Sequence, residues 1–350
     1  MKRALKLVLF GAAPLAVSAG LLLAPWRSPA PAAAGALAPS RAPAAPSLPA
    51  GTLRDPLAPE QLVRLDEGRA GAANWVSARP GFQTSRPAAE RKGVEPCATQ
   101  AIDTSAFEEW QTLSRGHFTL PKGFQLDSAG SFDLVMHLNG DQPVLRELVE
   151  SGQRFVLYTF TLPPTQGYAS FGGSHLLPAL LTEIEQGVSK RVGKPARHRR
   201  LALSAWSAGF VGVGAVLAQP EGESVDAVLL IDGLHAPRND RPAFEAQLKP
   251  FVRYAARAAA GERFFLVSHS SIDPPGFAST TECSHYLIQS LAGRPQSVRR
   301  EDAMGLELVE YFTRGEFHVR GYSGNDKADH CAQLAVLRGA FTALAERWKH

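Results

Sequence analysis

The sequence has little of what marks a metal-binding or nucleic-acid-binding protein. Only three of its 350 residues are cysteines, Cys97, Cys283 and Cys331, so at most one intramolecular disulfide can form, and the spacing does not decide which two pair. No spacing among the cysteines and the ten histidines resembles a structural zinc site, and no helical His-x-x-x-His pattern occurs. The formal net charge of +4 is too small to indicate nucleic-acid binding. We therefore expect no metal, no cofactor and no nucleic-acid partner.

Charge is also scarce near the start of the chain. Three basic residues, Lys2, Arg3 and Lys6, precede an uncharged run over 7–25 and then alanine-rich candidate cleavage sites. This pattern predicts a signal peptide within 1–34, and hence a periplasmic or secreted protein. An uncleaved membrane anchor is the alternative, because the run approaches spanning length.

Two kinds of sequence follow this leader. Residues 35–100 form an alanine- and proline-rich linker and a polar irregular segment, a composition that cannot bury enough apolar surface to fold. Residues 101–350 carry the folded domain. The densest basic cluster, 190–200, is expected to be a solvated loop.

Within the folded domain, apolar strands alternate with helices. The expected strands are 132–138, 154–162, 201–206, 225–231 and 263–267, and the expected helices are 143–151, 174–191, 243–260, 280–291 and 331–348. A hairpin over 107–124, turning at 121–123, and an extended region over 306–322 complete the pattern. Because the strands are apolar throughout, we predict an α/β three-layer sandwich with a mostly parallel central sheet. No long insertion follows the strand before Asp232, so we expect no large cap domain. The strands of the sheet end at one edge, where ligands bind.

The segment around Ser207 joins one of these strands to a helix. Ala205 and Gly209 lie two residues on either side of the serine, and a strand-to-helix corner this tight requires small neighbours there. Such a corner exposes the hydroxyl above the sheet. The alternative is a serine that only caps the following helix. Trp206 and Phe210 are expected in the core.

Polar and titratable residues gather at the predicted strand ends: His137, Asn139, Ser207, Asp232, His235, His269 and Asp273, with His330 before the last helix. The corner and the order serine, aspartate, histidine resemble the α/β-hydrolase family over about residues 101–350. That resemblance implies that Ser207 is a nucleophile and His330 its general base. His318 lies in a predicted strand and is expected to pack or bond locally.

The resemblance leaves the acid open between two aspartates. Asp273 follows its strand by a short loop, the usual position in the family, and is slightly preferred; Asp232 directly follows the preceding strand. Either would hold the imidazole tautomer and stabilise the imidazolium.

The family also implies an oxyanion hole, formed by the backbone N–H of Ala208 and one from the loop of His137, Asn139 and Gly140. As a turn without catalytic duty, that loop would look the same. His235 and His269 are expected to hydrogen-bond along the rim rather than bind metal.

Together these features predict an exported serine hydrolase acting on a small-molecule or lipid-like acyl substrate, an ester or alternatively a thioester or amide. The rival hypothesis is a secreted, non-catalytic binding module for a surface glycan or protein. The acyl group and the oligomeric state are not readable from the sequence.

Overall fold

The computed structural model describes residues 103–162, 167–173, 176–302 and 305–349. The predicted leader and linker at 1–100 lie outside the described residues and stay predictions. Among the described residues, no helix combines the length and apolar character needed to cross a membrane.

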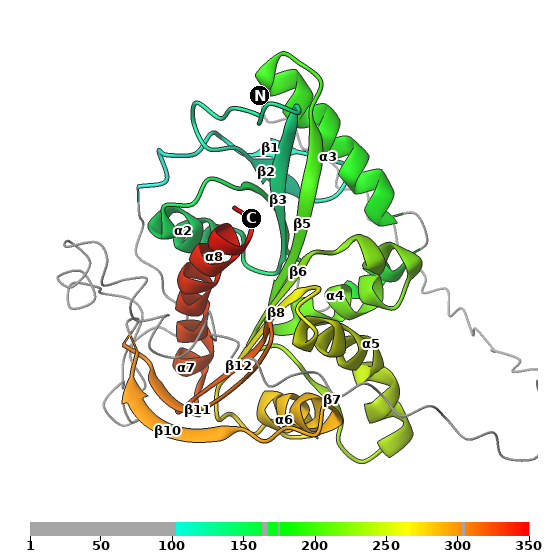
Figure 1. Cartoon of the computed structure of the whole chain (residues 1–350), viewed down its shortest axis with the longest axis vertical. Helices are drawn as coiled ribbons and strands as arrows, with labels where there is room; N and C mark the ends of the chain where they lie inside the picture. The colour runs from blue at the N-terminus through cyan, green and yellow to red at the C-terminus, as the bar shows by residue number, and fades with distance from the viewer. Residues whose placement is uncertain (1–102, 163–166, 174–175, 303–304, 350) are drawn as a thin grey trace, which may run out of the picture. The chain divides into compact units, whose positions relative to one another are not determined.

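A ten-stranded sheet runs through the domain in the order β1-β2-β4-β3-β5-β6-β8-β12-β11-β10 (Figure 1). Neighbouring strands from β4 to β12 in this order pair in parallel, and those at both edges pair antiparallel. The strands are β1 Gln111–Thr112, β2 His117–Thr119, β3 Ser131–Leu138, β4 Val156–Phe160, β5 Arg197–Trp206, β6 Ala227–Ile231, β8 Phe264–His269, β10 Gln296–Glu301, β11 Glu307–Arg314 and β12 Phe317–Tyr322. A separate short ribbon pairs β7 Ala236–Pro237 with β9 Phe277–Ala278.

Helices cover both faces of this sheet, which confirms the predicted three-layer α/β class (Figure 1). The α-helices are α2 Asp141–Ser151, α3 Leu176–Val192, α4 Phe210–Leu217, α5 Arg241–Ala259, α6 Thr280–Ser290, α7 Lys327–Ala332 and α8 Val336–Arg347. Short 3-10 turns are η2 Tyr168–Gly172, η3 Ser207–Gly209, η4 Pro220–Ser224 and η5 Gln333–Ala335.

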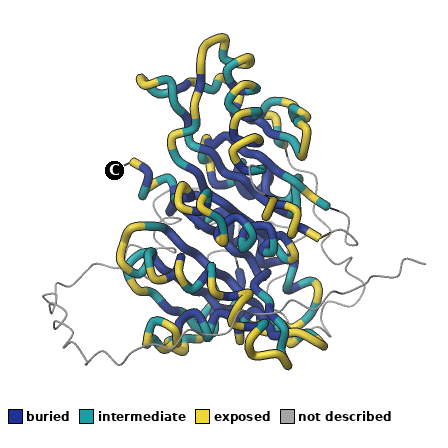
Figure 2. The backbone as a smooth tube through the Cα atoms, turned by 90° about the vertical axis from the view of Figure 1, so that its right-hand side faces the viewer, coloured by how far each residue is buried: buried dark blue, intermediate teal, exposed yellow. Residues whose placement is uncertain are grey.

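Two apolar cores explain why the central strands are hydrophobic throughout. Leu134 and Met136 of β3 pack with α3, α4, α5 and α6, whereas the intervening Val135 packs with α2 and α8. Successive side chains of a strand point to opposite faces, so a strand covered on both faces must be apolar at every position. Figure 2 shows the sheet as a buried layer between more exposed segments.

Three sequence predictions differ from the structure. The turn predicted at 121–123 is present, with a φ of 64° at Gly123, but it follows β2; the hairpin itself turns between β1 and β2 near Gly116, where φ is 66°. The end of the chain is not one helix over 331–348 but α7, η5 and α8, and His330 lies inside α7.

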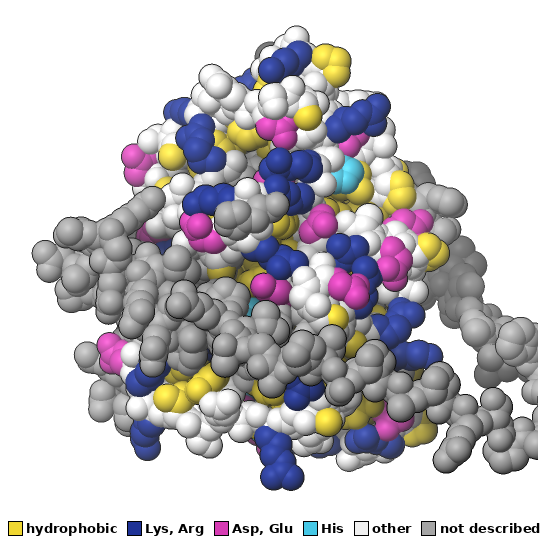
Figure 3. Space-filling model, viewed as in Figure 1, with side chains coloured by type: hydrophobic (Ala, Val, Ile, Leu, Met, Phe, Trp, Pro, Cys, Tyr) yellow, Lys and Arg dark blue, Asp and Glu magenta, His cyan; other side chains and the backbone are white. Residues whose placement is uncertain are grey.

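The third difference concerns the basic cluster 190–200, in which only 193–196 form the predicted solvated loop, while the residues before and after it end α3 and begin β5. Two of its arginines form ion pairs: Arg199 lies 3.0 Å from Asp133, and Arg197 lies 4.0 Å from Glu185. On the face shown in Figure 3, Lys and Arg side chains are interspersed with Asp and Glu.

The cysteines divide into two kinds. Cys331 is disulfide-bonded, while Cys283 is a free and buried thiol. A Cys283–Cys331 pair is therefore excluded. Burial raises the pKa of Cys283 to about 12, so this thiol stays protonated and unreactive at neutral pH.

Candidate active site

Ser207 lies at a sharp corner between β5 and η3, with a φ of 54°. A residue other than glycine rarely adopts this left-handed backbone. Two glycines make room for the corner: a Cβ on Gly209 would lie 2.2 Å from the Leu138 carbonyl oxygen, and one on Gly233 would lie 2.2 Å from that of Ser207. Ala205 is fully buried beneath. The corner has the strained geometry expected of a nucleophile elbow, not that of an ordinary helix cap.

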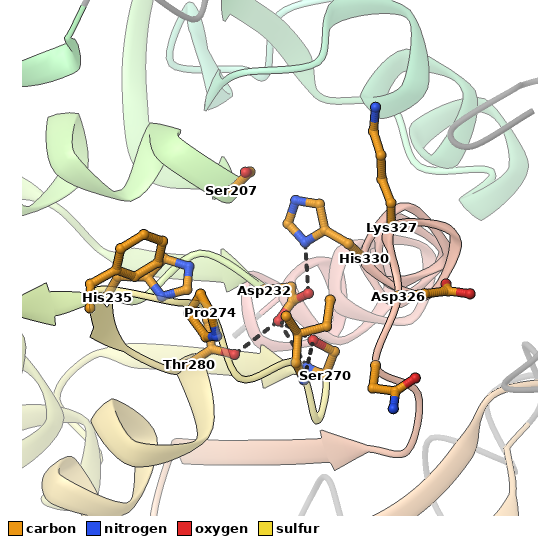
Figure 4. A pocket seen from close by; sticks show the side chains of 12 residues that line it. Ser207, Asp232, His235, Ser270, Pro274, Thr280, Asp326, Lys327 and His330 are labelled. Atoms are coloured by element: carbon orange, nitrogen blue, oxygen red, sulfur yellow. Dashed lines mark hydrogen bonds and ion pairs between the residues drawn. The ribbon is translucent and has the colours of Figure 1, made fainter. Parts of the chain in front are cut away.

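Asp232 stands at the end of β6, the strand next to β5, also with a positive φ of 42°. Its Oδ1 accepts hydrogen bonds from Ser270 N at 2.8 Å, Ser270 Oγ at 3.0 Å and Thr280 Oγ1 at 3.0 Å. Its Oδ2 lies 2.7 Å from His330 Nδ1 (Figure 4). Both oxygens of this buried carboxylate thus have hydrogen-bond partners, which fixes its orientation.

These partners keep Asp232 charged. Burial by itself would raise the pKa of the carboxyl group, but the hydrogen bond and charge of His330 and the bonds from Ser270 outweigh it and lower the pKa below its usual range. A buried carboxylate held in this way can stabilise a neighbouring imidazolium.

His330 is held by α7 and by the tryptophan before Ser207. Asp326 and Asp329 form a reciprocal capping box at the start of α7, which fixes the turn that carries the histidine. The Trp206 ring stacks on the imidazole, with centroids 4.9 Å apart, and Trp206 Nε1 donates to the His330 carbonyl oxygen at 3.2 Å. The expectation that Trp206 belongs only to the core was therefore incomplete, whereas Phe210 is buried as expected.

Ser207, Asp232 and His330 line one pocket of about 320 Å³. In Figure 4 the Ser207 hydroxyl and the His330 ring both face this space. Among the described residues, no hydrogen bond reaches Ser207 Oγ, so the hydroxyl is open to the pocket. The other walls are His235, Ser270, Ile272, Pro274, Phe277, Thr280, Asn325, Asp326 and Lys327.

The preference for Asp273 over Asp232 is corrected by this geometry. The Asp273 side chain is 75% exposed and pairs with Arg238, which also lies 2.9 Å from Glu282. The loop after β8 places Asp273 outside the pocket, and it instead brings Ser270 to Asp232.

The loop after β3 has the positive φ angles that Asn139 and Gly140 predicted, but the backbone N–H groups of both residues already donate hydrogen bonds. Asn139 and Gly140 have φ values of 79° and 119°. Asn139 N donates to the Phe160 carbonyl at 3.1 Å, and Gly140 N donates to Thr161 Oγ1 at 2.9 Å. Neither is a free oxyanion donor, which corrects that part of the prediction. Asn139 Nδ2 instead donates to the Trp206 carbonyl at 3.1 Å and so ties the loop to the elbow. Ala208, after the serine, is exposed.

Two histidines predicted at the rim are buried instead. His137 lies 2.8 Å from Ser204 Oγ and 3.0 Å from the Asn139 carbonyl oxygen, and burial lowers its pKa to about 4. His269 is 1% exposed and points away from the pocket, toward Glu310. The helical layers on the two faces of the sheet extend over the ends of β3 and β8, so the side chains of His137 and His269 are buried.

His235 does line the pocket, as predicted. Its Nδ1 lies 3.0 Å from the Ala278 carbonyl oxygen, and its ring packs edge-on against Phe210 and Phe277. Burial lowers its pKa, so it contributes a neutral, partly apolar wall. His318 is fully buried in β12 and lies 3.1 Å from Thr313 Oγ1, in agreement with the local role expected of it.

Sequence reasoning missed Ser270, Thr280 and the positioning role of Trp206. A signal existed for the first two, since both flank the loop after β8, but their contact with Asp232 depends on how β6 and β8 pair.

The mostly parallel sheet with helices on both faces is the fold that the α/β-hydrolase resemblance predicted. No protein-family model matches the chain, and no curated protein matches it in sequence. Solved structures to which the chain is similar include esterases and hydrolases.

One is a mutant of the feruloyl esterase module from Clostridium thermocellum, complexed with sinapinate (12% identity, 75% of this chain and 94% of that chain, TM-score 0.42). A second is a siderophore hydrolase from Aspergillus nidulans (12% identity, 70% and 96%, TM-score 0.41). A third is a carboxyl esterase from the mycorrhizal fungus Tuber melanosporum (12% identity, 78% and 96%, TM-score 0.38). The chemistry of this chain follows from its own residues.

Proposed function

We propose that this protein is a serine hydrolase that cleaves an ester-type acyl substrate through an acyl-enzyme on Ser207. One observation carries the proposal: an aspartate-bound histidine and a serine on a strained strand-to-helix corner open into the same pocket. A structural role needs neither the positive φ of Ser207 nor an open hydroxyl, whereas nucleophilic catalysis uses both.

In the first half of the reaction, Ser207 Oγ attacks the substrate carbonyl carbon, and His330 Nε2 takes the serine proton. Because His330 Nδ1 donates to Asp232, the free nitrogen of the neutral ring is Nε2, the one required for a base. The Asp232 carboxylate then stabilises the imidazolium. The hydrogen bond between Ser207 and His330 forms in the substrate complex, since such bonds are often long in empty sites.

The tetrahedral intermediate carries a negative oxygen, and the backbone N–H of Ala208 is the donor assigned to it. Collapse of the intermediate breaks the bond to the leaving group, which receives its proton from His330 Nε2. Water, deprotonated by the same nitrogen, then attacks the acyl carbon and releases the acid and the free serine.

The walls of the pocket suggest the kind of group that is held. Ile272, Pro274 and Phe277 are apolar, and Phe277 is the one large hydrophobic residue that is strongly exposed among the described residues, at 41%. Asn325 and Lys327 are polar. An ester with an apolar or aromatic portion and a polar portion fits this mixed lining. Export through the predicted segment 1–34 belongs to the same proposal and is tested by sequencing the N-terminus of the secreted protein.

The test is labelling by a fluorophosphonate probe, with Ser207→Ala and His330→Ala as the variants. We expect the wild-type protein to label stoichiometrically and to hydrolyse short aryl esters, Ser207→Ala to do neither, and His330→Ala to label far more slowly. Circular dichroism checks that each variant is folded. A folded wild-type protein that does not label, or a Ser207→Ala protein that labels equally, would refute the proposal. The first result would favour the non-catalytic binding module.

A further inference from the structure

A second cluster of titratable side chains lies behind the site and is not used by the proposed reaction. It consists of His269 at the end of β8, His285 on α6 and Glu310 on β11. One ligand atom from each lies within 4.8 Å of the other two. Glu310 Oε1 is shared, at 3.1 Å from His269 Nε2 and 2.6 Å from His285 Nε2.

His269 Nδ1 lies 3.0 Å from the Ser270 carbonyl oxygen, which can only accept, and 3.0 Å from Thr281 Oγ1, which lies 3.0 Å from the same carbonyl oxygen. When Nδ1 donates to that carbonyl, the Nε2 lone pair of a neutral ring faces a carboxylate oxygen. The side chain is 2% exposed, and Nε2 is buried without a hydrogen bond of acceptable geometry. A buried nitrogen lone pair beside a carboxylate is unfavourable unless a cation or a proton lies between them.

The side chains of this cluster pack directly against β12, where only glycine fits. A Cβ on Gly321 of β12 would lie 2.5 Å from His269 Cε1, 2.6 Å from Glu310 Cγ and 2.7 Å from His269 Nε2. Any other residue at 321 would therefore displace two of the three side chains. On the outer side, the His285 side chain is 32% exposed and that of Glu310 is 18% exposed, which leaves a route for an ion and for water.

We propose that His269, His285 and Glu310 form a binding site for one divalent transition-metal ion of the zinc class. Two imidazoles and one carboxylate are ligands that Zn²⁺ accepts, with a fourth position for water. Ligand atoms of tetrahedral zinc lie about 3.4 Å apart, given zinc–ligand bonds of roughly 2.1 Å. The separations of Glu310 Oε1 from His269 Nε2 and His285 Nε2, 3.1 Å and 2.6 Å, are shorter than that value, and rotation of the part-exposed His285 would lengthen the second when an ion binds. The bond from Nδ1 to the Ser270 carbonyl is the outer-shell contact that orients metal-bound histidines.

The site is linked to the catalytic acid by a single residue. The Ser270 carbonyl holds His269, while the Ser270 N–H and hydroxyl hold Asp232. A bound ion would thus brace the loop that orients Asp232 without entering the pocket. This inference contradicts the sequence-based expectation of no metal, which considered His269 only with Asp232 and Asp273.

The experiment is titration of the full chain, first dialysed against a chelator, with ZnCl₂ by calorimetry and with CoCl₂ by visible absorption. We expect one equivalent to bind, and Co²⁺ to give the absorption bands of a low-coordinate nitrogen and oxygen site. His285→Ala and Glu310→Gln should each weaken binding by more than the roughly 10- to 100-fold loss that outer-shell changes cause. The milder His285→Gln should weaken it in the same direction if His285→Ala does not fold.

Two matched controls locate the ion. His198→Ala removes a histidine that also faces a glutamate, with Nδ1 2.7 Å from Glu185, but outside the cluster. His330→Ala removes the histidine of the pocket. Both should bind Zn²⁺ like the wild-type protein. The proposal is overturned if the wild-type chain binds no stoichiometric Zn²⁺, if the folded cluster variants bind it unchanged, or if His330→Ala alone abolishes binding. Calorimetry needs no enzymatic turnover, so a failure of the proposed hydrolase activity gives a different result.

Discussion

Asp232 Oδ2 and His330 Nδ1 lie 2.7 Å apart although 98 residues separate them in the chain. The contact joins the end of β6 to α7 across the edge of the sheet. Asp232→Asn would replace the accepting oxygen with an amide that donates toward Nδ1, so the imidazole would take the tautomer that cannot accept the serine proton. From the proposed mechanism we expect kcat for an aryl ester to fall by about 10³- to 10⁴-fold.

The matched control for this change is Asp273→Asn. Its carboxylate is mostly exposed and pairs with Arg238, and exposed ion pairs contribute little to stability. We expect steady-state kinetics within about twofold of wild type, since surface changes of this kind are nearly neutral. A large loss in Asp273→Asn together with an active Asp232→Asn would reverse the assignment of the acid.

Trp206 should act as a positioning residue for His330. Trp206→Phe keeps a ring against the imidazole but removes the Nε1 bond to the His330 carbonyl, and a net hydrogen bond of about 1 kcal/mol corresponds to about a fivefold change in rate. We expect kcat to fall by that factor with KM unchanged, and Trp206→Ala to lose more. If both variants changed KM alone, Trp206 would be a substrate contact instead.

Gly233 should be needed for the elbow rather than for the fold as a whole. Its Cβ would lie 2.2 Å from Ser207 O and 2.7 Å from Ser207 N, so Gly233→Ala must displace the serine. Misplacement of a reacting group by about 1 Å can cost roughly 10²-fold in rate, and we expect a loss of that order in fluorophosphonate labelling. Gly167→Ala is the control, because open space surrounds that position and its φ is −86°. Equal labelling of both variants would show that the corner tolerates a side chain.

His137 should make stability depend on pH. Burial lowers its folded pKa to about 4, whereas an unfolded histidine has a pKa of 6.5. Between these values the unfolded chain binds more protons, so stability rises with pH through this window and falls as the pH drops. The stability that neutral His137 contributes is therefore fully present at neutral pH, and no more of it is lost below about pH 4.

The measurement is urea denaturation at pH 7 and pH 5. From this residue alone, linkage gives a loss of about 2 kcal/mol between the two values. His137→Asn should lower stability at pH 7 but reduce the difference between pH 7 and pH 5 by a comparable amount. An undiminished difference in the folded variant would show that other groups cause the acid sensitivity.

Local patterns in the sequence predicted much of the fold. The apolar runs that became β3, β4, β5, β6 and β8 are unambiguous because each is buried on both faces, and the small residues around Ser207 mark a corner that larger ones would block. Both depend on short-range sterics and burial, which a sequence expresses residue by residue. The apolar strands and the small residues around Ser207 together place the Ser207 hydroxyl at the edge of the sheet.

Tertiary structure alone decided which aspartate lies beside His330 and where the other polar side chains lie. Asp232 and Asp273 both follow parallel strands, and nothing local distinguishes them; the path of the loop after β8 turns one into a buried, fourfold-bonded carboxylate and the other into an exposed partner of Arg238. His269 was assigned to the rim because its strand ends there, yet its side chain points to α6 and β11, which follow it in the chain. Contacts of this kind depend on strand pairing and helix packing between distant segments, and their energies appear only once those segments meet.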